Sequence, residues 1–288
     1  MYSPKEIAQN YIATGVAKIK IPTSKMLLLG ILAGIQIALA GVGAIIAPAT
    51  IASASLGTLI AALVFPTGIA MVLLAGSELF TGNCLMIIPV LQKEIKLEAM
   101  LKNWLCVYAG NFIGGVFIAA ITVYSGTFSL FGDAAAVYVI KTAAAKVSLS
   151  FSDALLRGVL CNFLVCAAVW MSYASKDVVG KVAAMFLPIM LFVLSGYEHS
   201  NANMFFIPAG LFASRNMAYL DAYIATAGTG YIGALTWGSL FIKNLIPVTI
   251  GNIIGGSVLI GAAYWFIYLR ESPTKTPASS GGKKKKKK

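Results

Sequence analysis

Long apolar stretches separated by short polar segments dominate this chain of 288 residues. A helix needs roughly 20 apolar residues to cross a bilayer core that is about 30 Å thick. Six stretches are long and apolar enough, and each is predicted to be a membrane-spanning helix. They cover residues 26–49, 58–91, 103–127, 154–174, 183–213 and 245–269. The second and fifth are too long, and too polar in the middle, to be ordinary spans.

The composition agrees with this pattern. Hydrophobic residues make up 59% of the chain and charged residues only 11%, and the mean hydropathy is +0.84. A soluble protein of this length could not be coated by so little polar surface. We therefore expect an integral, all-α membrane protein whose main surroundings are the lipid bilayer.

The positive charge of the chain has two sources. The formal net charge is +12, but six of these charges lie in the run Lys283–Lys288, which leaves +6 elsewhere. This run follows a segment rich in Pro, Ser and Gly, so residues 273–288 are interpreted as a disordered basic tail or tag. The charge is therefore no sign of a nucleic-acid partner.

The other lysines predict the orientation in the membrane. Lysines lie before the first span, between spans two and three, and between spans four and five, whereas the loop between spans one and two has no charge. The positive-inside rule then places both termini in the cytoplasm. Arg215 and Lys243 are exceptions on the outer side.

The first 25 residues are predicted to form a separate amphipathic helix ahead of a six-span domain over residues 26–272. Ser3-Pro4-Lys5-Glu6 is a capping box with proline at the first helical position. An apolar stripe follows at helical spacing. Such a helix can lie on the membrane surface, and packing on its own protein or on a neighbouring subunit is an equally open alternative.

An internal repeat explains the two unusual spans. Gly76-Ser-Glu-Leu-Phe-Thr-Gly-Asn83 in the second matches Gly196-Tyr-Glu-His-Ser-Asn-Ala-Asn203 in the fifth, and spans three and six share Asn-x6-Gly-Asn-x2-Gly-Gly from Asn103 and Asn244. Two matches in the same order indicate a duplicated three-helix unit. Because three is odd, the two copies insert with opposite orientations. The fold class is therefore six transmembrane helices in two inverted three-helix repeats, with helices 2 and 5 interrupted.

The polar residues at the interruptions suit a broken helix. Its free backbone groups can bond to side chains or line a cavity, the two conditions under which irregular backbone survives in lipid. Glu78, Asn83 and Glu198, together with Gly76 and Gly196, are interpreted as structural residues at the breaks. A structural brace is favoured over a direct catalytic role for the two glutamates.

The only histidine, His199, adjoins the second break, where the first repeat has Leu79. From position alone, a functional and a structural role are equally open. An ionisable group inside the membrane indicates function by default, and desolvation favours a neutral ring that can exchange a proton.

Three segments carry a resemblance to a known family. Ser77-Glu-Leu-Phe-Thr81, Gly196-Tyr-Glu-His-Ser200 and the run from Leu245 to Gly256 closely resemble the formate/nitrite transporter family, particularly its formate channels. The resemblance implies a homopentamer of aquaporin-like protomers in the prokaryotic cytoplasmic (inner) membrane. Each protomer would pass small monovalent anions such as formate, nitrite or hydrosulfide through its own pore. The Asn-Pro-Ala pair of true aquaporins is absent, which disfavours a water or glycerol channel.

The resemblance also implies roles for single residues. The family's central histidine corresponds to His199, its pore threonine to Thr81, and its outer-vestibule lysine, in the loop before span four, to Lys146. The predicted pathway also includes Asn162 and Asn203. The hydrophobic constrictions correspond to Leu79 and Phe80 on one side and to Phe65, Ile69 and Phe192 on the other. Simple core packing is an equally open interpretation of the last three.

A bare anion loses its hydration in an apolar constriction, at a cost of many kcal/mol. We therefore expect an anion to share a proton with His199 and to cross as its neutral acid, or alternatively to pass charged through a passive channel. An intramembrane enzyme would need a nucleophile–base pair or a metal cluster. The chain offers one histidine and four cysteines without Cys-x-x-Cys spacing, so no enzyme, cofactor, metal site or disulfide is predicted. Small-residue runs such as Gly30-x3-Gly34 and Gly251-x3-Gly255 allow close packing of helices, between protomers or within one.

Overall fold

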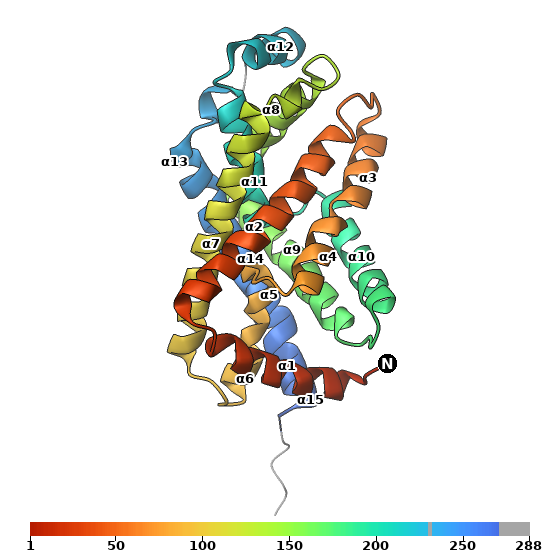
Figure 1. Ribbon diagram of the computed structural model, residues 1–288, viewed down its shortest axis with the longest axis vertical. Helices are drawn as coiled ribbons and strands as arrows, with labels where there is room; N and C mark the ends of the chain where they lie inside the picture. The colour runs from red at the N-terminus through yellow and green to blue at the C-terminus, as the bar shows by residue number, and fades with distance from the viewer. Residues whose placement is uncertain (230–231, 271–288) are drawn as a thin grey trace, which may run out of the picture.

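The computed structural model describes residues 1–229 and 232–270, and the regular structure in this part of the chain is helical throughout. Most helices run along the long axis of the molecule (Figure 1). Helices α1 (Pro4–Ile19) and α15 (Ala263–Tyr268) lie at one end, called the α1 end below. Helix α12 (Met217–Ala227) lies at the opposite end, called the α12 end.

The remaining helical segments connect these two ends. In chain order they are α2 (Thr23–Ile46), α3 (Ala54–Val64), α4 (Pro66–Ala75), α5 (Phe80–Asn83), η1 (Cys84–Met86), α6 (Ile87–Leu91), α7 (Leu97–Tyr124), η2 (Thr127–Ser129), α8 (Ala134–Val147), α9 (Phe151–Ser172), α10 (Val178–Leu194), α11 (Ser200–Ala213), η3 (Ile232–Ala234), α13 (Trp237–Ser239), η4 (Leu240–Leu245), α14 (Ile246–Ile253) and η5 (Ile254–Ala262). Segments η4 and η5 are π-helical and continue directly into their neighbours.

Five helical stretches within the described residues are long and apolar enough to cross a membrane. They are Thr23–Ile46, Ala54–Ala75, Leu97–Tyr124, Phe151–Ser172 and Trp237–Tyr268. Two shorter apolar segments, Phe80–Leu91 and Val178–Leu194, add to these. Four of the six predicted stretches match one of the long helices, with ends that differ by one to eight residues. At their start, these four helices extend three to eight residues ahead of the apolar stretch, because their first turns lie outside the hydrocarbon region. At the other end, they stop one to three residues before the stretch does.

The other two predicted stretches are each divided by a short non-helical segment. Helix α4 ends in Gly76 (φ +75°), and α10 is followed by Gly196 (φ +66°). A residue with a side chain pays about 1–2 kcal/mol in this left-handed conformation, which explains glycine at both positions. The chain then becomes extended, and helix resumes directly after Leu79 and His199. We refer to residues 76–79 as the first break and to residues 196–199 as the second break.

Helix α1 packs against its own chain. The predicted capping box is confirmed, because the Ser3 side chain accepts from the Glu6 N–H and the Glu6 side chain accepts from the Ser3 N–H. Ile7 and Tyr11 are buried in a core cluster that includes residues of η1, α6 and α7. The backbone N–H of Tyr2 donates to the carbonyl of Ala174 at 2.9 Å. The N-terminal helix is thus held at its start and along one face.

Helix α8 occupies the segment before α9, where the sequence indicated only a loop. Its buried face is built from small and β-branched residues and packs against α11. The stretch has only 14 residues and contains Lys141 and Lys146, so no spanning pattern marks it. Its last turn places Lys146 beside the second break.

The small-residue runs serve contacts within the protomer. A side chain at Gly34 would clash with the backbone of Asn111 on α7, and one at Gly255 would clash with the backbone of Val159 on α9. Helix α2 therefore approaches α7 closely, and the helical run Trp237–Tyr268 approaches α9 in the same way. These two close contacts hold the side chains that brace the breaks.

Candidate functional site

Thr81 and His199 meet at the centre of the molecule. Thr81 lies in the first turn of α5, and His199 is the residue that caps the start of α11. Thr81 Oγ1 and His199 Nε2 are 2.8 Å apart, and both residues are buried. His199 Nδ1 accepts from the backbone N–H of Ala202 at 3.2 Å. A neutral imidazole that accepts at Nδ1 carries its proton on Nε2, so Nε2 donates to Thr81 and the Thr81 hydroxyl proton remains to be donated.

Asn162 holds the backbone of Thr81 through a hydrogen bond. Its Nδ2 donates to the backbone carbonyl of Thr81 at 3.2 Å and to that of Asn252 at 2.7 Å. The thiol of Cys166 also donates to the Thr81 carbonyl, at 3.3 Å. The structure therefore places the amide of Asn162 on the backbone that carries Thr81.

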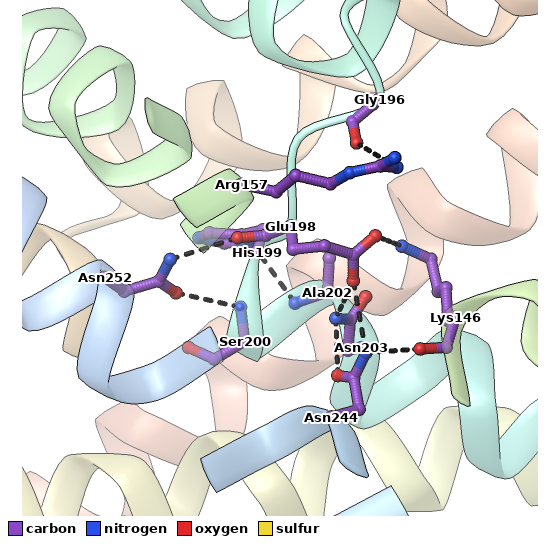
Figure 2. A network of polar contacts seen from close by, with 10 residues as sticks. All are labelled: Lys146, Arg157, Gly196, Glu198, His199, Ser200, Ala202, Asn203, Asn244 and Asn252. Carbon is purple, nitrogen blue, oxygen red and sulfur yellow. Dashed lines mark hydrogen bonds and ion pairs between the residues drawn. The ribbon is translucent and has the colours of Figure 1, made fainter. Parts of the chain in front are cut away.

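A polar network surrounds Glu198 in the second break (Figure 2). Its Oε1 lies 2.9 Å from Nζ of Lys146, and its Oε2 accepts from Nδ2 of Asn203 at 2.6 Å and from Nδ2 of Asn244 at 3.2 Å. Asn244 also donates to the backbone carbonyl of Lys146 at 3.0 Å. The lysine predicted for the outer vestibule is thus paired with a carboxylate one residue before His199.

The first break has a matching network. Glu78 Oε1 lies 2.5 Å from Nζ of Lys18, and Glu78 Oε2 accepts from Asn83 at 2.7 Å. Asn83 also donates to Asn103 at 2.8 Å, just as Asn203 donates to Asn244 at 2.7 Å. The glutamates therefore make the contacts expected of a structural brace, and each also fixes an ammonium group near the centre.

The sequence interpretation missed the role of Lys18, which it counted only as an orientation signal. A signal was present, because Lys18 precedes Gly30 by twelve residues and Lys146 precedes Gly158 by the same interval. The two glycines make equivalent contacts, since Asn111 donates to the carbonyl of Gly30 and Asn252 to that of Gly158. The correspondence of the halves thus extends to the helices that precede α2 and α9.

Asn252 braces the second break with three hydrogen bonds. Its Oδ1 accepts from the backbone N–H of Ser200 at 3.0 Å, and its Nδ2 donates to the carbonyls of Glu198 at 3.0 Å and Gly158 at 2.8 Å. The Ser200 N–H lies in the first turn of α11 and has no partner within that helix. The amide of Asn252 therefore satisfies backbone groups that the break exposes.

Asn111 does the same at the first break. Its Oδ1 accepts from the Phe80 N–H at 3.0 Å, and its Nδ2 donates to the carbonyls of Glu78 at 2.9 Å and Gly30 at 2.7 Å. Its Oδ1 also accepts from Asn201 of the other half. Sequence reasoning identified both asparagines as repeat markers without assigning them this function.

A cavity of about 170 Å³ reaches His199 from the α12 end. Its lining includes Lys146 and Glu198 together with Phe65 and Phe192. The rings of Phe65 and Phe192 contact edge to face at 5.8 Å, and the ring of Phe192 lies 5.7 Å from that of His199. A cationic group and an aromatic pair therefore lie along the approach to the buried histidine.

The structure brings together four of the five residues predicted for the constrictions. Phe65, Ile69, Leu79 and Phe192 belong to one buried cluster. Phe80 lies in a different cluster, with ring contacts of 5.8 Å to Trp104 and 5.0 Å to Tyr108. Neighbouring residues in an extended segment point to opposite sides, so Leu79 and Phe80 separate where helix resumes.

The sequence profile described as Formate/nitrite transporter matches residues 5–266. The chain belongs to the formate/nitrite transporter family. A probable formate transporter of Methanothermobacter thermautotrophicus is 38% identical, over 93% of this chain and 98% of the relative. The formate channel FocA of Escherichia coli K12 is 39% identical, over 73% of this chain and 74% of its own. A solved structure described as a pentameric formate channel with formate bound has 32% identity and a TM-score of 0.76, covering 86% of this chain and 98% of the other.

Membership of this family confirms the resemblance drawn from the break motifs. It places the chain among transmembrane transport proteins rather than enzymes. An all-helical membrane fold agrees with the helices described above.

Proposed function

We propose that this chain is a membrane channel for small monovalent weak-acid anions, with formate first and hydrosulfide or nitrite close behind. The contact between Thr81 and His199 carries this proposal, because it joins α5, which follows the first break, to the second break at the buried end of a cavity. The relatives named as formate channels support formate as the first substrate to test.

The cavity is lined by Lys146, whose ammonium group is paired with Glu198, and by the ring pair of Phe65 and Phe192. An anion that passes these rings loses most of its hydration. The hydroxyl of Thr81, which accepts from the Nε2–H of His199, offers its own proton in exchange. The break backbones are satisfied by asparagine amides, so this donor is held in place before the anion arrives.

Two accounts of the crossing differ in the fate of a proton. In the first, His199 shares a proton with the anion, which crosses as its neutral acid. The ring would then have to be protonated at both nitrogens, and Nδ1 would have to release the N–H of Ala202. In the second, the ring stays neutral and only polarises the site. The bond between Nδ1 and Ala202 supports the second account.

The architecture fits this function. We infer that the halves are inverted repeats in an aquaporin-like arrangement, with a pathway between the breaks, and that the protein assembles as a homopentamer. The α1 end then faces the cytoplasm of a prokaryotic cell. In this interpretation residues 1–25 form the leading helix and residues 26–272 the channel domain. The proposed tail at 273–288 lies outside the described residues.

A competitive flux assay in proteoliposomes tests the proposal. Formate, hydrosulfide and nitrite are offered at several pH values to wild type, His199→Asn and His199→Phe. Flux of at least one anion above that of empty liposomes is expected, and its absence for all three would refute a channel. If His199 shares a proton, both variants lose the pH dependence. Current recordings separate the two accounts, because passage of the neutral acid carries no net current.

A further inference from the structure

A second cavity, of about 150 Å³, lies at the α1 end between α4, α9 and α10. Its lining residues are Leu73, Leu74, Ser172, Tyr173, Lys181 and Met185. The hydrogen-bond networks fix the correspondence between the two halves. Glu78 corresponds to Glu198 at a shift of 120 residues, and Gly30 corresponds to Gly158 at a shift of 128. Each lining residue therefore has a counterpart in the other half.

Five of these counterparts line the first cavity. In the same register, Leu73 corresponds to Val193, Ser172 to Ala44, Tyr173 to Ile45, Lys181 to Ala61 and Met185 to Phe65. The correspondence of the two linings indicates that the two cavities are equivalent by the internal repeat. We call the first cavity the α12 mouth and the second cavity the α1 mouth.

The two linings differ in polarity at three corresponding positions. Ala44, Ile45 and Ala61 at the α12 end are apolar where the α1 end has Ser172, Tyr173 and Lys181.

Each half also has one lysine that is paired with a break glutamate, namely Lys18 with Glu78 and Lys146 with Glu198. Lys146 lines the first cavity, whereas Lys18 is not among the residues that line the second. At the α12 end, the exposed Arg157 donates to the carbonyl of Gly196, which lines the first cavity. At the α1 end, Lys181 is the cationic residue that lines the second cavity.

The charge of Lys181 has no close counter-ion among the described residues. The ion pairs within 4.0 Å in that part of the chain are those of Lys18 and Lys146. The nearest acid along the helix, Asp177, accepts from the backbone N–H of Gly180 and from Ser175. Lys181 is exposed and lines the cavity, so its field extends into the mouth.

We propose that Lys181 is an anion-collecting group at the α1 mouth. This inference rests on the proposed anion channel function. A cavity with low-dielectric walls focuses the field of a single charge and raises the local concentration of the opposite ion. Lys181 acts at a distance on the approach of the anion, so it is a positioning residue outside the Thr81–His199 contact.

Substitutions of Lys181 test the role of charge in formate flux through proteoliposomes. At low ionic strength we expect Lys181→Gln to lower the flux about two- to fivefold and Lys181→Glu to lower it further. Lys181→Arg keeps the charge and should keep the flux. The effect should shrink as a large, impermeant salt is added, because exposed charges are screened over about 10 Å at 0.1 M.

Lys176→Gln is the control. Lys176 lies five residues away, outside both cavities, with its ammonium 4.7 Å from the ring centroid of Tyr2. Its removal should leave the flux unchanged. The inference is overturned if Lys181→Gln matches wild type, if it lowers the flux equally at all salt concentrations, or if Lys181→Arg fails to restore the flux. Wild-type flux no greater than that of empty liposomes would instead refute the proposed function itself.

Discussion

The asparagine that braces the second break allows a quantitative test of the architecture. Asn252→Leu keeps the approximate size of the side chain and removes its amide. The backbone N–H of Ser200 and the carbonyl of Glu198 then lose their partner in a buried segment. Each unsatisfied buried group costs about 1–3 kcal/mol, so the loss should be about 2–6 kcal/mol. The carbonyl of Gly158 adds little, because it lies inside α9 and can retain its helical bond.

Asn111→Leu should cost a similar amount, because its amide makes the equivalent bonds at the first break. The control is Asn10→Leu, at an exposed position of α1, with an expected change within about 0.5 kcal/mol. The measurement is thermal unfolding in detergent followed by intrinsic fluorescence. Trp104 is a suitable reporter, since its Nε1 donates to the carbonyl of Asn83 near the first break. A melting temperature of Asn252→Leu equal to that of the control would show that the break does not depend on this brace.

Three further changes follow from the geometry. Thr81→Val removes the hydroxyl that contacts His199 and should lower formate flux. Thr81→Ser keeps a hydroxyl and should retain most of the flux. Equal flux in the two variants would show that the hydroxyl takes no part in transport. Gly196→Ala should destabilise the protein by about 1–2 kcal/mol in the same unfolding assay. The cause is backbone strain alone, since nothing lies within 4 Å of the added Cβ. An unchanged stability would contradict this. The Gly180 N–H lowers the pKa of the exposed Asp177 carboxylate, so its stabilising effect is present above the ordinary pKa and is lost as the pH falls. The melting temperature of Asp177→Ala should therefore fall less than that of wild type between pH 7 and about pH 3, and parallel curves would refute the assignment.

Much of the fold could be predicted because the decisive signals are local. Hydropathy identifies the spanning stretches, and Gly76 and Gly196 mark the two places where the helix ends inside them. The Ser3–Glu6 capping box is also encoded by neighbouring residues. The repeat was visible because the same side chains return at the same spacing. Apart from the repeat, which compares two distant segments, each of these signals depends on residues close together in the chain.

The parts that were missed depend on distant contacts. Lys18 reaches Glu78 because α1 folds back on the chain. Its twelve-residue spacing to Gly30 marks it as the equivalent of Lys146, but this spacing does not contain the contact with Glu78. Phe80 was grouped with Leu79, but the turn into α5 sends it toward Trp104 and Tyr108. Asn162 has no polar equivalent in the first half, where Gly34 stands in its place, so the repeat gave no indication of its partner.

The Thr81–His199 contact has a consequence for expression of the two halves of the chain as separate fragments. Thr81 belongs to the first half of the chain and His199 to the second. Neither half contains the donor pair, although each contains its own break, glutamate and asparagine brace. A chain divided in the loop before α8 would yield two fragments that are inactive alone and become active only when they associate. Flux measured with the two fragments together then shows whether the halves have associated. If either half inserts wrongly into the membrane, the contact between Thr81 and His199 cannot form, although both residues are unchanged.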